Sequence, residues 1–212
     1  IRLDGRAFHT FTKGFNKPFD DCFNNCMTKT MLYLCENISN SVFGYTQSDE
    51  ITLILVDYKN LDSCAWFDYE VQKLCSVSAS MATVAFNHAF KHECAAQTKR
   101  LNTEYLNVKD ASYIIALEKA MNKGAMFDAR VFNIPKEEVT NLIYWRQLDA
   151  TRNSIQMVGQ ANFSHKELHG KNCSDIQDML MLQKGVNWND YPTTLKRGSC
   201  CIKKPFKINE GT

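Results

Sequence analysis

The chain has 212 residues, of which 44% are hydrophobic and 23% charged, and its formal net charge is +2. These fractions are typical of globular proteins and exclude a disordered or collagen-like chain. The most apolar run, residues 51–56, is far shorter than the ~20 residues that a membrane-spanning helix needs, so we expect no membrane partner. We expect a cytoplasmic protein, or an organellar one if a targeting segment precedes Ile1.

Nine cysteines stand at irregular spacings along the chain. A secreted disulfide framework prefers short chains and even counts, so this pattern favours a reducing compartment. We therefore expect most of the thiols to act as small buried hydrophobes, and a single structural disulfide is the alternative.

The first 56 residues predict a strand, a helix and a hairpin. Residues 2–4 have the pattern of a strand end, and apolar side chains recur at three- and four-residue spacing over 19–38, as on one face of a helix. Residues 42–45 and 51–56 are rich in β-branched and aromatic side chains. The polar stretch 46–50 between them predicts a hairpin turn.

The middle of the chain predicts two more helices and a strand. A long helical pattern covers about 66–90, and residues 94–126 are polar and less regular, except for a short helix near 111–121. Residues 127–134 are a further strand candidate. Pro135 stops this strand and can begin a helix that runs to about residue 163.

Two capping boxes mark short helices nearer the C-terminus, at residues 164–167 and 174–177. Gly170 and Gly185 stand where each of these helices would end.

The order strand, helix, strand, strand, helix, strand in residues 1–134 is the split βαβ pattern of ferredoxin-like folds. We therefore expect an α+β fold with a βαββαβ core and additional C-terminal helices. Residues 135–212 would be a helical, basic part that packs on this core, and the two parts would form one compact domain. The basic residues near the C-terminus suggest a surface for a polyanion, and a solvated tail is the alternative.

This topology brings three acidic residues toward one edge of the sheet. The first strand and the hairpin are neighbours, so Asp4 can meet Asp49 and Glu50. Converging carboxylates repel one another unless a cation compensates them, and oxygen ligands select Mg²⁺. The Gly5 carbonyl can add a further ligand. Enzymes that transfer nucleotidyl groups commonly use two Mg²⁺ ions bound by carboxylates. The alternative interpretation is that these acidic residues are ordinary surface residues.

Two histidine pairs suggest alternative functional sites. His165 and His169 share a helix face, but Lys166 stands where the zinc-protease pattern needs Glu, so contact with RNA phosphates is favoured over a metal. His88 and His92, with Cys94, lack an obvious fourth zinc ligand. No Walker loop or dinucleotide fingerprint is present, which argues against a P-loop kinase.

Five short motifs together resemble the tRNA(His) guanylyltransferase family over nearly the whole chain. They are RLDGRAFH at 2–9, KP at 17–18, QSDE at 47–50, FDARV at 127–131 and WRQLD at 145–149. The resemblance implies a core like the palm domain of polymerases, and extension of RNA in the 3′-to-5′ direction. It also implies two Mg²⁺ ions per active site, ATP, GTP and other NTPs as substrates, tRNA as partner and a homotetramer.

One departure from the family pattern is informative. Where eukaryotic members carry HINNLYN, this chain has TRNSIQM at 151–157. Together with SHKELHGKN at 164–172 and NWND at 187–190, this is similar to the guanylyltransferase-like branch of bacteria, phages and some protists. Members of that branch prefer templated repair of 5′-truncated tRNAs. The alternatives are addition of a single G to tRNA(His), another palm-type enzyme, or a non-catalytic RNA-binding module.

The resemblance also implies roles for individual residues. Asp4 and Asp49 would ligate both metals with help from the Gly5 carbonyl, and Glu50 would support the site or contact a metal. Phosphate and base contacts are expected from Gly5, Arg6, Ala7, Phe8 and His9 around the triphosphate, from Lys17, Ser48 and Lys73 on phosphates, and from Asp20 on the purine. Contacts with RNA or an activating nucleotide are expected from Arg130, Arg152, Asn153, His165, Lys166, Lys171, Lys184, Lys196 and Arg197.

Overall fold

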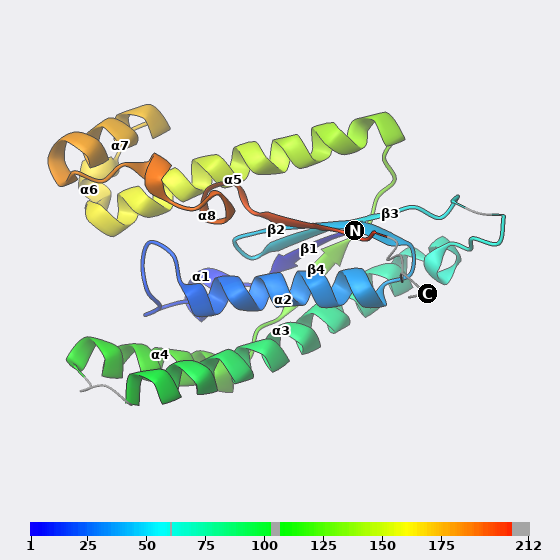
Figure 1. Ribbon diagram of the computed structural model, residues 1–212, viewed down its shortest axis with the longest axis horizontal. Coiled ribbons are helices and arrows are strands. Elements are labelled where there is room, and N and C mark those ends of the chain that lie inside the picture. The colour runs from blue at the N-terminus through cyan, green and yellow to red at the C-terminus, as the bar shows by residue number, and fades with distance from the viewer. Residues whose placement is uncertain (60, 103–106, 205–212) are drawn as a thin grey trace, which may run out of the picture.

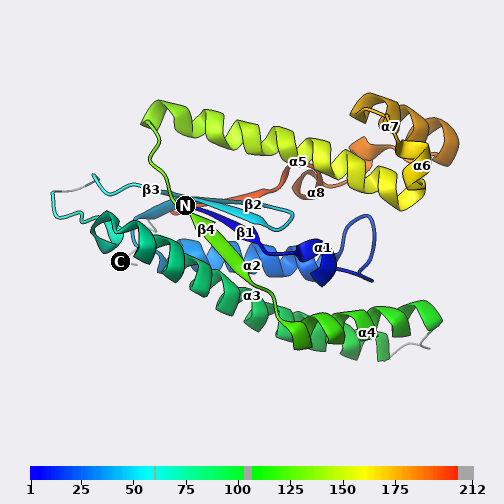
Figure 2. The ribbon, with the colours of Figure 1, turned by 180° about the vertical axis from the view of Figure 1, so that it is seen from behind.

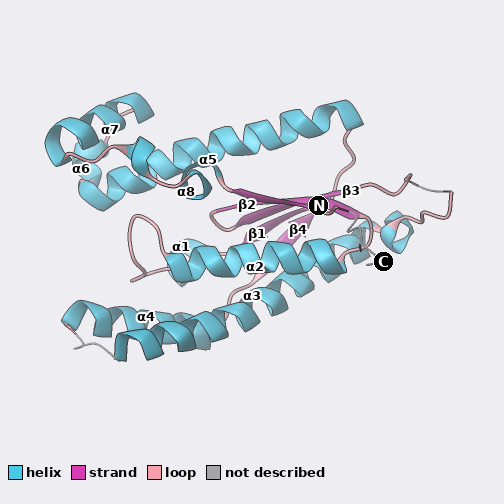
Figure 3. Ribbon diagram, viewed as in Figure 1, coloured by secondary structure: helices cyan, strands magenta, loops and turns pink. Residues whose placement is uncertain are grey.

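The computed structural model of the protein describes residues 1–59, 61–102 and 107–204. Its centre is a five-stranded antiparallel sheet with the strand order β4-β1-β3-β2-β5 (Figures 1 and 3). The strands are β1 (Arg2–Gly5), β2 (Ser41–Gln47), β3 (Glu50–Leu55), β4 (Phe127–Arg130) and β5 (Ser199–Ile202). The first four strands have the order of a ferredoxin-like core. The predicted α+β fold is therefore confirmed, and β5 extends the sheet beyond β2.

Two long helices cover one face of the sheet, and a third lies over the other (Figures 1 and 2). Helices α2 (Asp21–Asn37) and α3 (Val71–Asn102) pack on the first face, and α4 (Val108–Lys123) packs on α3. Helix α5 (Val139–Asn162) crosses the opposite face. Leu3 of β1 points toward α2 and α3 and is fully buried, so the alternating side chain of Asp4 points toward the α5 side.

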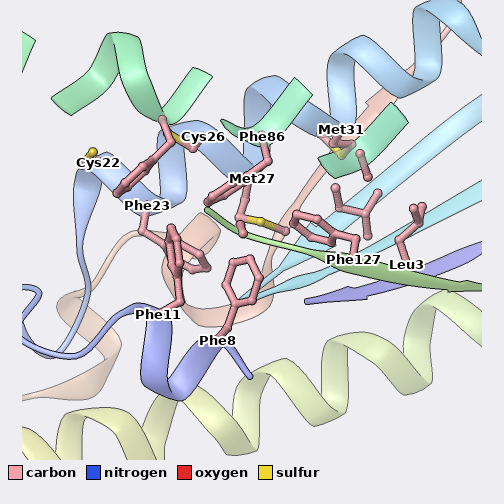
Figure 4. Packing of buried hydrophobic residues seen from close by; sticks show 14 of the residues in the cluster. Leu3, Phe8, Phe11, Cys22, Phe23, Cys26, Met27, Met31, Phe86 and Phe127 are labelled. Carbon is pink, nitrogen blue, oxygen red and sulfur yellow. The ribbon is translucent and has the colours of Figure 1, made fainter. Parts of the chain in front are cut away.

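The core between the sheet, α2 and α3 is dominated by phenylalanine rings (Figure 4). The ring of Phe8, in the single-turn helix α1 (Phe8–Phe11), lies 5.5 Å from that of Phe86 and 5.2 Å from that of Phe127. Burying a phenylalanine side chain stabilises a fold by about 1.5–3 kcal/mol. The buried Phe8 ring therefore attaches the turn that follows β1 to the hydrophobic core.

The C-terminal layer has its own apolar cluster, built around Val158, Leu180 and Trp188. Its helices are α6 (His165–Leu168), α7 (Cys173–Met179) and α8 (Thr193–Arg197); α6 and α7 gather at the C-terminal end of α5, and α8 lies alongside α5 (Figure 1). The Trp188 indole donates to Ser154 Oγ at 3.1 Å, and Ser154 Oγ donates to the Lys196 carbonyl at 3.3 Å. These bonds tie α8 to α5.

Several predicted boundaries differ from the structure. Residues 94–126 are more regular than expected, since α3 continues to Asn102 and the Asn107 side chain caps α4. The strand from Phe127 ends at Arg130, and α5 begins at Val139 after a short turn of 3-10 helix. The capping box at 164–167 is confirmed, whereas the second was wrong: Asn172 is the cap of α7, with Asp175 as its partner.

The burial of the cysteines also differs in part from the prediction. All nine are free thiols among the described residues, and only Cys22, Cys26, Cys35 and Cys94 are buried. Fewer than half of them therefore act as buried hydrophobes. None of the described helices combines the length and apolarity that crossing a bilayer requires.

Candidate active site

A cavity of about 450 Å³ opens at the end of the sheet where β1 and the β2–β3 hairpin meet. This volume lies in the range of small-molecule sites. Its walls come from the turn after β1, the loop before α2, the hairpin tip, α5 and α8. The lining includes Gly5, Ala7, Phe8, His9, Lys17, Asp20, Asn24, Ser48, Asp49, Asn153, Ser154, Met157, Gln160, Thr194, Leu195 and Gly198.

The turn after β1 is tightly constrained. A Cβ atom on Gly5 would lie 2.4 Å from the Phe8 ring, so only glycine allows that ring to fold back beneath the strand. Ala7 then adopts a left-handed conformation with φ of 54°, and the Arg6 N–H donates to the Met126 carbonyl at 2.9 Å. The first N–H groups of α1 have no acceptors within the helix, so they can bind an anion.

Of the two predicted metal-binding aspartates, Asp4 lies on β1 and Asp49 lies in the neighbouring turn between β2 and β3. Asp4 stands opposite Glu50 of β3 and Asp128 of β4, and the Gly5 N–H donates to the Asp49 carbonyl at 3.0 Å. Burial raises the pKa of Asp4, and the carboxylates of Glu50 and Asp128 raise it further. Burial is also the largest cause of the raised pKa of Asp49, with Asp4 adding to it and the Ser48 hydroxyl opposing it.

These oxygen donors fit a hard divalent cation. Among the described residues, neither Asp4 nor Asp49 has a salt bridge within 4.0 Å, and although Arg2 and Arg130 act to lower the pKa of Asp4, burial and the nearby carboxylates outweigh them. No cluster of three or more His, Cys, Asp or Glu side chains suited to a metal occurs in the described ranges. A cation here would therefore take two carboxylates, with backbone, water or phosphate oxygens completing its shell.

Glu50 is engaged differently from the two aspartates. Its Oε1 accepts from Arg2 Nη2 at 2.5 Å, and its Oε2 forms a salt bridge with Arg146 Nη2 at 3.1 Å. Gln47 Nε2 also donates to Oε2 at 3.3 Å. Both carboxylate oxygens are therefore occupied, and of the two predicted roles the structure favours support of the site over direct metal contact.

Arg146 connects this network to α5. It bonds Asp149 at 2.6 Å as well as Glu50, and Arg152 bonds the other oxygen of Asp149 at 3.0 Å. Arg146 lies in the WRQLD motif, but the sequence alone predicted no role for it. No local signal could reveal it, because its partner Glu50 is distant in the sequence and meets it only when α5 crosses the sheet.

The predicted nucleotide contacts divide into two groups. Lys17, Ser48 and Asn153 line the cavity, as do all of residues 5–9 except Arg6. Asp20 also borders it, but its carboxylate accepts the N–H groups of Asn16 at 3.1 Å and Phe23 at 2.9 Å. That carboxylate caps α2 and orders the loop before it, so a base contact would have to share oxygens already in use.

Lys73 lies away from the cavity, unlike most of the other predicted phosphate contacts. It lies in the first turn of α3 and pairs with Glu70 at 3.0 Å. Its neighbours Val71 and Leu74 line a second cavity, of about 1040 Å³, which also includes Ile1. Since β1 runs from Ile1 toward Gly5, Lys73 stands at the opposite end of the sheet from the first cavity and does not contact its nucleotide phosphates within one chain.

The predicted RNA contacts mostly gather on α5 and the C-terminal layer. Arg152 is exposed, Lys184 lies 5.2 Å from the Phe163 ring, and Lys196 lies 5.2 Å from the Trp188 ring. His165, Lys166, Lys171 and Arg197 belong to the same layer, whereas Arg130 of β4 pairs with Asp128 at 3.5 Å beside Asp4.

The histidine pairs gain no further ligand from the fold. The rings of His165 and His169 are 6.4 Å apart, and those of His88 and His92 are 4.5 Å apart. Neither pair forms part of a three-ligand cluster among the described residues, and Cys94 is buried in the main core.

Sequence reasoning missed several cavity residues. Asn24, Met157 and Gln160 come from helix interiors, and Thr194, Leu195 and Gly198 come from a segment that carried no motif. Asp128 was quoted in the FDARV motif without a role, although strand pairing places it directly beside Asp4.

The sheet order and the position of the acids are those of a palm-like nucleotidyltransferase fold, and comparison with known proteins agrees. The family described as tRNAHis guanylyltransferase matches residues 1–135. The chain therefore belongs to the tRNA(His) guanylyltransferase family.

Relatives and solved structures extend the match to nearly the full chain. A probable tRNA(His) guanylyltransferase of Dictyostelium discoideum is 26% identical, covering 98% of this chain and 75% of the relative. An uncharacterised protein of Acanthamoeba polyphaga mimivirus is 29% identical, covering 99% and 71%. A bacterial tRNA(His) guanylyltransferase-like protein solved in complex with ATP is 42% identical, with a TM-score of 0.79 over 96% of this chain and 78% of that one. A bacterial protein of the same description, in complex with GTP, is 38% identical, with a TM-score of 0.74 over 98% and 76%.

The network at Glu50 predicts energetic coupling between β3 and α5. Glu50→Gln and Arg146→Met should each lower the free energy of unfolding by about 1–3 kcal/mol, because each leaves a partly buried charged group with fewer partners. The double variant should lose about 1–2 kcal/mol less than the sum of the two, as measured by urea unfolding. The matched control is Arg152→Met, whose side chain is 64% exposed and should change stability by at most about 0.5 kcal/mol. Strict additivity would show that the two residues do not act together.

The burial of Asp49 predicts a pH-dependent gain on removing its charge. Because its pKa is raised in the fold, ionisation destabilises the folded chain. That penalty is present at neutral pH and disappears below the ordinary aspartate pKa of about 3.9. Without divalent cations, Asp49→Asn should therefore unfold at higher urea concentration than the parent at pH 7, with a smaller difference near pH 4. Asp21→Asn, at an exposed position in the first turn of α2, is the control and should give no gain. A loss of stability in Asp49→Asn at pH 7 would contradict the assignment.

Proposed function

We propose that the chain adds nucleotides to the 5′ end of 5′-truncated tRNA in a template-dependent, 3′-to-5′ reaction. The observation that carries the proposal is a cavity lined by Asp49 and by the turn after β1, with Asp4 on the strand that leads into this turn. The likeness to bacterial proteins in complex with ATP and with GTP supports a nucleotide as its occupant. The departure from the HINNLYN motif favours templated repair.

Asp4, Asp49 and the Gly5 carbonyl would hold Mg²⁺, which supplies neutralisation of phosphate charge and a lower pKa for an attacking hydroxyl. We expect two such ions per active site. Lys17, Ser48 and the backbone N–H groups of residues 7–9 would bind and orient the triphosphate. Glu50, held by its two arginines, would keep β1 and the hairpin in register so that both aspartates face the same phosphates.

The reaction would proceed in two transfers. The 5′-monophosphate of the tRNA first attacks the α-phosphate of ATP, which releases pyrophosphate and leaves an adenylylated 5′ end. The 3′-hydroxyl of an incoming NTP then attacks that end and expels AMP, so the RNA grows by one nucleotide at its 5′ terminus. The described cavity requires no side chain to act as general base, since the acids nearest the hydroxyl would be metal ligands.

The exposed basic residues of α5 and the C-terminal layer would contact the tRNA or the activating nucleotide. Asn153 lines the cavity, and Arg152 and Lys196 are next to cavity-lining residues in the sequence, which supports this role. We further propose a homotetramer, in which one tRNA spans more than one subunit. Sedimentation velocity tests this, and a monomer at all concentrations would exclude it.

A 5′-extension assay tests the proposed reaction. The substrate is a 5′-monophosphorylated tRNA that lacks its first nucleotide, with ATP, the four NTPs and Mg²⁺ present. The parent should restore the template-matched nucleotide. Asp49→Asn should lose at least about 100-fold in rate because one carboxylate ligand is gone. Asp21→Asn, which changes an exposed aspartate outside the cavity, should keep the parental rate.

The outcomes separate the candidate functions. Addition of G alone, and to tRNA(His) alone, would replace templated repair by guanylyltransferase activity of the strict kind. Binding of tRNA with no nucleotide addition would indicate an RNA-binding module. Near-parental turnover by Asp4→Ala or Asp49→Ala would overturn the metal assignment.

A further inference from the structure

Two cysteines from distant parts of the sequence meet beside the sheet. The Sγ atoms of Cys35, in α2, and Cys201, in β5, are 3.1 Å apart, although the residues are 166 positions apart in sequence. A disulfide holds its sulfurs about 2.05 Å apart, so bond formation requires an approach of only ~1 Å.

The fold makes room for this contact through one glycine. Gly44 of β2 pairs with Cys201 of β5. A Cβ atom on Gly44 would lie 2.4 Å from the Cys35 sulfur and 3.0 Å from the Cys201 sulfur. Because side chains alternate along a strand, Cys201 points toward α2 while its neighbour Cys200 points to the other face and is exposed.

The two thiols differ in how far they are buried. Burial and the hydrogen bond with Cys201 raise the pKa of Cys35 to about 12, against smaller opposing effects of Ser41 and Lys203. Cys201 is the more accessible of the pair. An external oxidant would therefore reach Cys201 before Cys35.

We propose that Cys35 and Cys201 form a reversible disulfide when the protein meets a low-molecular-weight disulfide such as oxidised glutathione. The Cys201 thiolate attacks one sulfur of the oxidant, forms a mixed disulfide and expels one glutathione thiolate. Cys35 then loses its proton and attacks Cys201 Sγ, which expels the second glutathione. Two protein thiols are oxidised, and one oxidant molecule is reduced to two thiols.

The bond would fix one wall of the candidate active site. β5 has four residues, pairs with β2 alone among the described strands, and follows α8 directly. Thr194, Leu195 and Gly198 of that segment line the cavity. A disulfide to α2 would hold the segment in register against β2. This consequence rests on the proposed function, whereas formation of the bond does not.

The test is oxidation of the full chain with glutathione disulfide at neutral pH, followed by alkylation and non-reducing peptide mapping. We expect a cross-linked peptide pair containing Cys35 and Cys201. We also expect a melting temperature raised by roughly 5–15 °C, because the bond closes a very long loop, and this rise should be reversed by a thiol reductant. Cys200→Ser should behave like the parent, and Cys201→Ser should give neither the pair nor the rise.

Two results would overturn the proposal. One is a parent in which Cys35 and Cys201 are both recovered alkylated while Cys64 or Cys200 carries glutathione. The other is an equal rise in melting temperature for Cys201→Ser. Because neither readout involves nucleotide or tRNA, the disulfide can fail while the proposed reaction stands, and the converse also holds.

Discussion

The arrangement of the candidate active site depends on the position of Glu50 between two arginines. Glu50 lies on β3, Arg2 on β1 and Arg146 on α5, so one carboxylate joins three elements that are remote in sequence. Removing such charges from water is costly, and here Gln47 and Asp149 help to offset that cost by supplying further hydrogen bonds. β1 and α5 also carry Asp4 and Asn153, and Asp49 directly precedes β3 in the hairpin turn, so the network holds together the elements around the cavity. The network therefore determines both the fold on the α5 side and the geometry of the site.

The opposite face of β1 is organised by apolar packing instead. Gly5 lets the Phe8 ring fold beneath the strand, and that ring contacts those of Phe86 and Phe127. The strained turn at Ala7 is held between this aromatic core and the hydrogen bond from Arg6. A left-handed non-glycine residue costs about 1–2 kcal/mol, which the surrounding packing must exceed. The turn proposed to bind phosphates is therefore held by contacts within the chain itself.

Much of this architecture could be predicted from the sequence, because local patterns determined it. The helix face over 19–38 and the hairpin at 42–56 follow from side-chain periodicity, and pairing of the first strand with that hairpin brings Asp4 to Asp49. β5 could not be predicted in the same way, since a four-residue edge strand has too short a pattern and owes its place to pairing with β2. Arg146 and Asp128 were also beyond sequence reasoning, because their partners are defined by tertiary contacts. The position of Lys73 was also beyond sequence reasoning, because it depends on α3 beginning at the far end of the sheet from the cavity.

The distribution of charge at the site separates structural from chemical roles. Glu50 is neutralised by arginines, whereas Asp4 and Asp49 are left without such partners and have raised pKa values. If stability alone governed this edge of the sheet, a neutral side chain at Asp49 would serve the fold better than a buried carboxylate that repels its neighbour. These two carboxylates lie beside a turn whose N–H groups suit phosphates. A site that binds a divalent cation together with a polyanion requires such an arrangement, and this need can outweigh the cost in stability. Arg2 and Arg146 pair with Glu50 and form no salt bridge with Asp4 or Asp49, so they do not compete with a cation for those two carboxylates.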